Sequence, residues 1–145
     1  MDASTLAISA SGLRAERLRL DVIASNLANA NTTHTLEGGP YRRRNVIFVT
    51  EDFEDDFAAS IEALAERGAR QGVAVTGVVE DPRPPRLVFD PGHPDADDEG
   101  YVAYPNVNAA TELVDLMTAT RAYEANVQAV NATKRMGEAA LSMLG

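Results

Sequence analysis

The 145-residue sequence contains neither cysteine nor tryptophan, and only 6% of its residues are aromatic. Without cysteine, disulfide bonds, zinc–thiolate sites and thiol nucleophiles are all excluded. The scarcity of aromatic residues argues against a large conventional core and against an aromatic ligand cage. Apolar runs are short as well, and none approaches the roughly 20 residues that a membrane-spanning helix requires. We therefore expect no direct insertion into a membrane.

The first ten residues also lack the parts of a secretory signal. Asp2 comes early, no basic segment precedes an apolar one, and no long apolar core is present. These features argue against a cleaved signal peptide.

Positive charge is scarce, and the net charge of −9 is unevenly distributed. Residues 34–100 hold seven Arg against fifteen acidic residues, whereas residues 1–33 and 101–145 are nearly neutral. Near-neutral ends suit packing against one another, and an acidic middle suits exposure to solvent. Phosphate binding requires clustered cations, and Arg42, Arg43 and Arg44 are the only such cluster, so nucleic-acid binding is disfavoured. We expect this triplet to be the solvated end of a strand.

The C-terminal stretch, residues 109–145, has the pattern of one long helix with an apolar seam. No Pro interrupts it, and its seam residues recur at an average spacing of 3.5, as in a supercoiled helix. The series is Leu113, Leu116, Thr120, Tyr123, Val127, Val130, Lys134, Gly137, Leu141 and Leu144. A helix of this length extends about 54 Å at roughly 1.5 Å per residue. It therefore needs an equally long partner.

Residues 2–30 predict a second long helix with the same spacing. Its leucines recur every seven residues, at Leu6, Leu13, Leu20 and Leu27, with Ala3, Ala10, Arg17 and Ala24 between them on the seam. Small residues on one side of a heptad let a partner helix approach closely. Ile8, Val22 and Ile23 fall off this seam and need a further surface to cover them. Gly12 costs roughly 1 kcal/mol relative to Ala in a helix interior.

An asparagine-rich run, residues 25–33, follows the N-terminal seam. One interpretation is a helix terminator, since Asn tolerates the left-handed conformation that closes a helix. The other is that Asn26 and Asn29 hydrogen-bond across a helix interface and fix its register. The sequence leaves both open.

The middle of the chain predicts short strands and one short helix. The strands are expected at residues 41–49, 73–79, 86–89 and 101–104, and an amphipathic helix begins at Phe53. Asn106 or Asn108 then caps the C-terminal helix. The expected fold is mainly α, with two terminal helices forming a coiled-coil domain and a β-rich region projecting from it. The expected boundaries are 1–33 and 106–145 for the discontinuous helical domain and 34–105 for the middle region.

No constellation of residues points to catalysis, a cofactor or a metal. Asp95, Asp97 and Glu99 followed by Gly100 partly fit a calcium loop, but the twelfth position is Asn106 rather than the required Glu. His34 and His93 are not paired with further ligands in the sequence. We expect an exposed acidic turn and no enzyme.

Two segments resemble a known family. Ser25–Thr32, Ser-Asn-Leu-Ala-Asn-Ala-Asn-Thr, is similar to the N-terminal signature of the bacterial flagellar axial proteins, the rod, hook and hook-associated group. Thr120–Gln128, Thr-Arg-Ala-Tyr-Glu-Ala-Asn-Val-Gln, resembles their C-terminal signature. The motifs at Gly39–Arg42, Leu87–Ala96, Gly100–Val102 and Pro105–Asn108, together with the short length, narrow the resemblance to the proximal-rod proteins. It covers residues 1–48 and 73–140, and residues 50–72 match no pattern of the family.

The resemblance implies a non-enzymatic structural subunit of the flagellar rod, the shaft that transmits torque across the periplasm. Its partners would be copies of itself, other rod proteins and the type III export apparatus, through which it would pass without signal cleavage. The terminal helices would form the assembly interface, and packing between subunits would cover Val22 and Ile23. The residues expected to carry that interface are Leu13, Leu20, Leu27, Leu113, Leu116, Tyr123, Val127 and Val130, with Asn26, Asn29 and Asn126 setting its register.

Two other classes of function remain as alternatives. The first is a free-standing coiled-coil adaptor whose acidic middle recognises a basic partner. The second is an enzyme or calcium sensor that uses Asp95, Asp97 and Glu99.

Overall fold

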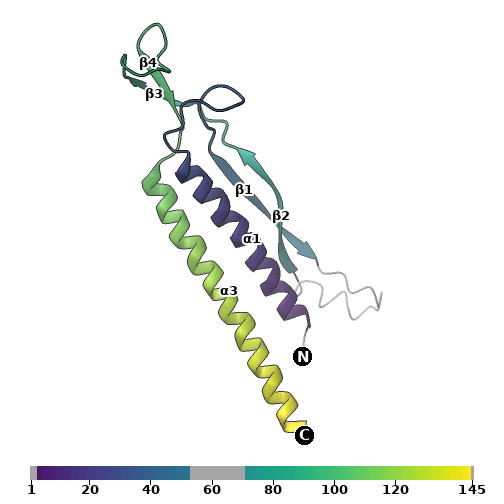
Figure 1. The fold of residues 1–145 in the computed structure, drawn as a ribbon. Coiled ribbons are helices and arrows are strands. Elements are labelled where there is room, and N and C mark those ends of the chain that lie inside the picture. The colour runs from purple at the N-terminus through teal and green to yellow at the C-terminus, as the bar shows by residue number, and fades with distance from the viewer. Residues whose placement is uncertain (1–2, 53–70, 145) are drawn as a thin grey trace.

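The computed structural model describes residues 3–52 and 71–144. Its elements are α1 (Ala3–Ala28), β1 (Arg44–Asp52), β2 (Gln71–Glu80), β3 (Arg86–Phe89), β4 (Tyr101–Tyr104) and α3 (Ala109–Leu144). The helices α1 and α3 lie side by side, the β1–β2 ribbon lies along α1, and the β3–β4 hairpin projects beyond one end (Figure 1). This arrangement confirms the predicted fold class of two long terminal helices with a small antiparallel β region between them.

The start of α3 is set by an asparagine cap. Asn108 Oδ1 accepts hydrogen bonds from the backbone N–H groups of Ala110 at 3.0 Å and Thr111 at 3.3 Å. These two N–H groups have no partner inside a helix, so the side chain satisfies them. Of the two caps that the sequence allowed, Asn108 is the one used.

Two contacts define the antiparallel register of α1 against α3. Asn26 Nδ2 lies 3.1 Å from Glu112 Oε2 at one end. At the other end, a Cβ placed on Gly12 would lie 3.1 Å from the side-chain oxygen and nitrogen of Asn126. The two contacts are 14 residues apart on each helix, which equals two heptads. The register is therefore compatible with a coiled coil, whose side-chain interlocking stays a prediction.

The packing seam of α3 differs from the predicted one at every second position. The residues turned inward are Glu112, Leu116, Ala119, Tyr123, Asn126, Val130, Thr133 and Gly137. Of the predicted series, Leu116, Tyr123, Val130 and Gly137 are turned inward and Val127 is half-buried as well, whereas Leu113 is 48% exposed and Leu141 is 70% exposed. The alternate set lies one residue earlier than predicted because polar and small side chains, rather than large apolar ones, fill it.

On α1 the four leucines predicted for the seam are half-buried. The residues predicted to alternate with them on the seam are exposed instead. Ala10, Arg17 and Ala24 are exposed, while Ala15 and Ile23 are among the most buried apolar residues. The reason is that α1 contacts two elements, α3 and the β1–β2 ribbon, so its buried face is wider than one heptad seam.

The β1–β2 ribbon is antiparallel, and it covers α1 from a second side. Thr76 is the additional residue of a β-bulge, because Ile47 pairs with Gly77 and Phe48 with Val75. The Ser11 hydroxyl of α1 donates to the Ile8 carbonyl at 2.7 Å and accepts the Val73 N–H of β2 at 3.0 Å. Ile23 of α1 is 5% exposed, so the chain itself buries it, and the expectation that packing between subunits covers Ile23 is wrong.

The four strands form where the sequence predicts them, but β1 and β2 differ from the prediction at both of their ends. β3 and β4 begin and end where predicted, and β2 is longer than predicted by a few residues. β1 begins at Arg44 rather than Tyr41, and the side chains of Tyr41 and Arg43 instead join a polar cluster described below. The amphipathic helix predicted from Phe53 lies outside the described residues.

Candidate assembly surface

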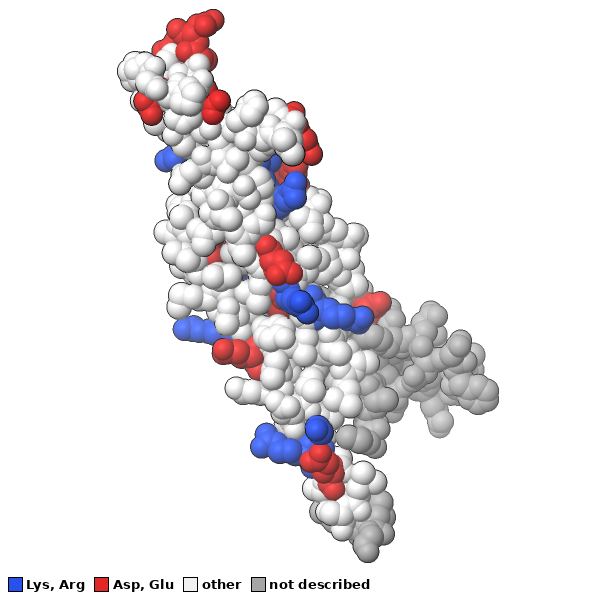
Figure 2. All heavy atoms as spheres, in the orientation of Figure 1, with Lys and Arg blue, Asp and Glu red and all other residues white. Residues whose placement is uncertain are grey.

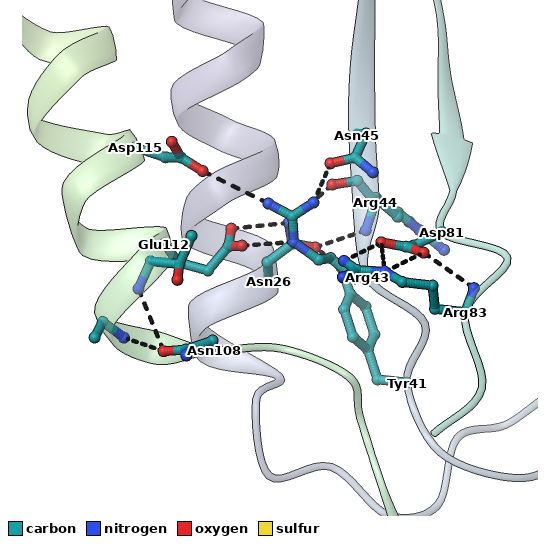
Figure 3. Close-up of polar contacts among 12 residues, drawn as sticks. Asn26, Tyr41, Arg43, Arg44, Asn45, Asp81, Arg83, Asn108, Glu112 and Asp115 are labelled. Atoms are coloured by element: carbon teal, nitrogen blue, oxygen red, sulfur yellow. Dashed lines mark hydrogen bonds and ion pairs between the residues drawn. The ribbon is translucent and has the colours of Figure 1, made fainter. Parts of the chain in front are cut away.

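A buried polar cluster joins α1, α3 and the start of β1, with Asn26 at its centre (Figure 3). The Asn26 side chain is 1% exposed. Its Nδ2 donates to the Arg44 carbonyl at 2.8 Å and to Glu112 Oε2 at 3.1 Å. Its Oδ1 accepts the Tyr41 hydroxyl at 3.0 Å and the Arg44 N–H at 2.9 Å. Both donated and both accepted bonds of this amide are therefore satisfied.

The charge in this cluster is a buried ion pair. Glu112 is 0% exposed, and its Oε1 accepts from Arg43 Nε at 2.6 Å. The same guanidinium bonds the Asn45 side chain and lies 3.6 Å from Asp115. A carboxylate removed from water is tolerated only when a cation and hydrogen bonds compensate it. Glu112 also lies in the first turn of α3, where the helix dipole favours negative charge.

The prediction that all three arginines form a solvated strand end is wrong for Arg43. Its side chain is only 17% exposed, while Arg42 and Arg44 are exposed. Sequence reasoning missed both members of the ion pair because each is charged. The available signal was that Glu112 occupies the same helical face as Ala119 and Asn126, where a charge requires a partner.

The other two asparagines expected to set register behave differently from Asn26. Asn29 Nδ2 donates to the Ser25 carbonyl at 2.9 Å, and its Oδ1 accepts from Thr32, so it closes the end of α1. Asn126 Nδ2 donates to the Ala122 carbonyl of its own helix at 3.0 Å. Its contact with α1 is steric, through Gly12.

Most of the predicted interface residues lie on α1 and α3 with part of their surface covered by the chain. Each of these side chains is half-buried: Leu13, Leu20, Leu27, Leu116, Tyr123, Val127 and Val130. Leu113 does not join them and is turned outward. Their role in contacts between subunits stays a prediction.

Several large apolar side chains of α3 and of the ribbon are exposed. Leu113, Val114 and Met117 near its start are between 48% and 62% exposed, and Met136 and Leu141 near its end are 73% and 70% exposed. The ribbon adds Ile47, Val49, Val78 and Val79, all between 42% and 44% exposed. Leu113, Val114 and Met117 lie within two turns of α3, and a group of exposed apolar side chains of this kind marks a protein interaction site.

A second ion pair fixes the connection between β2 and β3. Arg83 Nη2 lies 2.6 Å from Asp81 Oδ2, and the Arg83 N–H donates to Asp81 Oδ1 at 3.0 Å. The hydrogen bonds from the Arg83 side chain, followed by the one from its backbone, lower the pKa of Asp81 from 3.8 to about 2.

The acidic residues considered for calcium serve the loop between β3 and β4. Asp97 Oδ1 accepts the N–H groups of Glu99 at 3.0 Å and Tyr101 at 2.8 Å. Asp95 Oδ2 accepts the Thr33 hydroxyl at 2.7 Å, which ties this loop to the one after α1. Among the described residues, no group of three or more acidic or histidine side chains is arranged to hold a metal. None of the described helices is both long and apolar enough to span a membrane.

Two protein-family models match this chain, one near each end. The family model described as "Flagella basal body rod protein" matches residues 6–33, and "Flagellar basal body rod FlgEFG protein C-terminal" matches residues 98–143. These ranges include the two motifs at residues 25–32 and 120–128.

Curated relatives match over nearly the whole length. The flagellar basal-body rod protein FlgC of Borreliella burgdorferi is 42% identical over 97% of this chain and 96% of its own length. The FlgC proteins of Bacillus subtilis and Escherichia coli O157:H7 are 44% and 41% identical, covering 91% and 89% of this chain and 91% and 87% of their own. The chain belongs to the FlgC family of flagellar basal-body rod proteins.

Proposed function

We propose that this protein is a structural subunit of the flagellar basal-body rod and assembles through the faces of its helix pair that the chain leaves uncovered. The proposal rests on the outer face of α3, where Leu113, Val114 and Met117 are 48% to 62% exposed. The inner face of the same helix is already packed on α1. A helix that is apolar on both sides needs a partner on each.

The same reasoning extends to the half-buried residues between the helices. Leu13, Leu20 and Leu27 of α1 and Leu116, Tyr123, Val127 and Val130 of α3 keep part of their surface accessible. Neighbouring subunits, whether copies of this chain or related rod proteins, cover that surface in the assembled rod. Residues 1–33 and 106–145 then act as one helical unit, with residues 34–105 as the middle region.

The mechanical function follows from rigidity rather than chemistry. The ion pair of Arg43 with Glu112 and the hydrogen bonds of Asn26 tie α1, α3 and β1 together at one end of the helix pair. A subunit whose elements cannot slide past one another transmits torque to its neighbours. The subunit reaches the periplasm by export through the flagellar type III apparatus, without cleavage of a signal peptide.

The decisive experiment is deletion of the gene followed by electron microscopy of purified basal bodies. We expect basal bodies without a complete rod, and a plasmid copy of the gene restores the rod. Complete rods in the deletion strain refute the proposal. A stable helical dimer of the purified chain in sedimentation, together with complete rods, favours the adaptor alternative.

A further inference from the structure

A hydrogen bond joins the loop between β3 and β4, residues 90–100, to the loop after α1, residues 29–43. Asp95 Oδ2 accepts the Thr33 hydroxyl at 2.7 Å. Asp90 and Asp97 instead accept backbone N–H groups of the hairpin itself. In the described part of the chain, the Thr33–Asp95 bond is the one side-chain hydrogen bond between these two loops. It therefore holds the hairpin loop against the end of the helix pair.

His93 also bonds Asp95, but through the backbone. His93 Nδ1 accepts the Asp95 N–H at 3.1 Å, and the same nitrogen lies 3.9 Å from Asp95 Oδ2. A ring nitrogen that accepts a hydrogen bond carries no proton, so this is the neutral ring with its proton on Nε2. Pro94, between the two residues, has a fixed φ and limits how they move relative to each other.

The His93 ring is held in position by its neighbours. Its edge meets the Tyr104 ring with the centroids 6.2 Å apart, and its side chain is 25% exposed. The Arg86 guanidinium lies 5.8 Å from the centroid of the same Tyr104 ring. The backbone is fixed as well, because the His93 N–H donates to the Asp90 carbonyl at 3.2 Å and the His93 carbonyl accepts the Ala96 N–H at 3.1 Å. Protonation would therefore change the bonds of a ring whose place is already set.

The charged groups around this ring are mostly acidic, and Figure 2 shows acidic side chains gathered at this end of the molecule. Arg86 is the single cation of residues 86–104. The five carboxylates of that segment are Asp90, Asp95, Asp97, Asp98 and Glu99. On the facing loop, His34 and Glu37 are exposed, and neither forms an ion pair with His93 or Asp95 among the described residues. The carboxylate that a charged His93 ring meets first is thus that of Asp95.

We propose that protonation of His93 breaks the Thr33–Asp95 bond and makes the β3–β4 loop a pH-sensitive element. A proton on Nδ1 turns this acceptor into a donor, which then faces a second donor, the Asp95 N–H, at 3.1 Å. The nearest acceptor for the new N–H is the Asp95 carboxylate, which at 3.9 Å is beyond hydrogen-bond distance. Asp95 must turn its N–H away from the ring and its carboxylate toward it, and this movement takes Oδ2 away from the Thr33 hydroxyl.

The switch acts in the range in which imidazole titrates, roughly pH 5 to 8. Side-chain carboxyl groups stay ionised through most of this range. The chain has one other histidine, His34, which provides a matched control. The inference does not depend on the proposed function, because it concerns the isolated chain. Its failure leaves the rod function intact, and complete rods in the deletion strain leave the switch intact.

The test is the effect of Thr33→Val on the urea midpoint of the full-length chain at about pH 8 and about pH 5. This substitution removes the hydroxyl and adds no titrating group. We expect it to lower the midpoint at the higher pH, and to have an effect several-fold smaller at the lower pH, where the bond is already broken. Circular dichroism checks that each variant folds.

Two histidine substitutions assign the pH dependence. His93→Asn keeps an acceptor, because an Asn side chain can accept the N–H two residues on, but it cannot be protonated. In this background Thr33→Val should lower the midpoint equally at both pH values. In a His34→Gln background the difference between the two pH values should remain.

Three results would overturn the proposal. The first is an equal effect of Thr33→Val at both pH values in the otherwise unchanged chain. The second is no effect at either pH, since the bond then does not hold the loop. The third is a pH dependence that survives His93→Asn. Proton–nitrogen NMR spectra provide a second measurement, in which the Thr33 and Asp95 amide signals should titrate with the same midpoint as the His93 ring. Different midpoints contradict the exchange of partners.

Discussion

Arg43 and Glu112 form an ion pair, with 2.6 Å between Nε and Oε1, that connects the residue before β1 to the first turn of α3. The carboxylate is 0% exposed, so its charge depends on this one guanidinium and on the Asn26 amide. Burying a charge is costly, and its compensation is lost if one partner is removed.

We predict that Arg43→Met destabilises the chain by about 3 to 5 kcal/mol, because it leaves Glu112 buried without its cation. The free energy of unfolding is measured by urea titration followed by circular dichroism. Arg42→Met is the matched control, since it removes the same charge from an exposed neighbour and should change stability by less than about 0.5 kcal/mol. Equal effects of the two substitutions contradict the importance of the pair.

The double variant Arg43→Met with Glu112→Leu should recover much of the lost stability, because it removes both charges together.

Asn26 provides a second prediction, which compares it with Asn29 in the same asparagine-rich run. Asn26→Ala removes four hydrogen bonds and takes this partner from the Arg44 backbone groups and from Glu112, while the Tyr41 hydroxyl keeps its 3.3 Å hydrogen bond with the Ser25 hydroxyl. Each buried polar group left unpaired costs roughly 1 to 3 kcal/mol, so the loss should be at least about 2 kcal/mol. Asn29→Ala should cost about 1 kcal/mol or less, since it affects only the end of α1. A larger loss for Asn29→Ala than for Asn26→Ala would falsify the central role of Asn26.

The sequence predicted the elements well because their patterns are local. Helical periodicity located α1 and α3 to within two residues, and alternating β-branched and aromatic residues located β3 and β4. The asparagine-rich run at residues 25–33 allowed Asn26 to be either part of a helix terminator or a residue that hydrogen-bonds across a helix interface, and the structure places it in a hydrogen bond between the helices.

The packing could not be predicted in the same way, because it depends on residues far apart in the chain. Glu112 fills a seam position only because Arg43, 69 residues away, neutralises it. Apolar periodicity therefore selected Leu113, its neighbour, which is turned outward. Likewise, the heptad pattern of α1 does not indicate that Ile23 is buried within the chain, since that burial depends on tertiary structure.

Gly12 allows a third prediction, on the close approach of the helices. In an isolated helix Gly12→Ala would gain about 1 kcal/mol. Here the new methyl group would lie 3.1 to 3.2 Å from the Asn126 side chain, so we expect the gain to be cancelled. In an Asn126→Ala background the same change should recover about 1 kcal/mol, which a double-mutant cycle measures as coupling. Stabilisation by the full amount in the otherwise unchanged chain shows that the two residues do not touch.

A fourth prediction concerns the pH dependence of folding stability that arises from Asp81, which lies outside the helices. Arg83 lowers the pKa of this carboxyl from 3.8 to about 2, so the folded state favours the charged form. The resulting stabilisation is present above the unfolded pKa near 4 and is lost as pH falls through that value toward about 2. An NMR titration of the Asp81 carboxyl measures this directly. Arg83→Gln should return the pKa of Asp81 toward 3.8. Arg86→Gln is the control, because it removes another cation of the same connection that does not lower this pKa, and it should leave the pKa unchanged.

The assembly surface is tested most cleanly at Leu113. The half-buried Leu20 and Val127 are also expected to be needed, and Leu20→Asp or Val127→Asp should block rod assembly while export continues. Those changes, however, also place a charge between α1 and α3 and can act by unfolding the chain. Leu113 is 48% exposed, so Leu113→Asp should leave the urea midpoint nearly unchanged.

We therefore expect Leu113→Asp chains to fold and to be exported, yet to leave cells without complete rods and without motility. In the assembled rod, the new carboxylate would be buried in the contact between subunits without a cation. The resulting loss of free energy destabilises the rod and not the single subunit, in which the side chain stays exposed. Leu36→Asp makes the same chemical change at a fully exposed loop position away from the helices and should preserve motility. Normal swimming of Leu113→Asp cells means that the outer face of α3 is not a subunit contact.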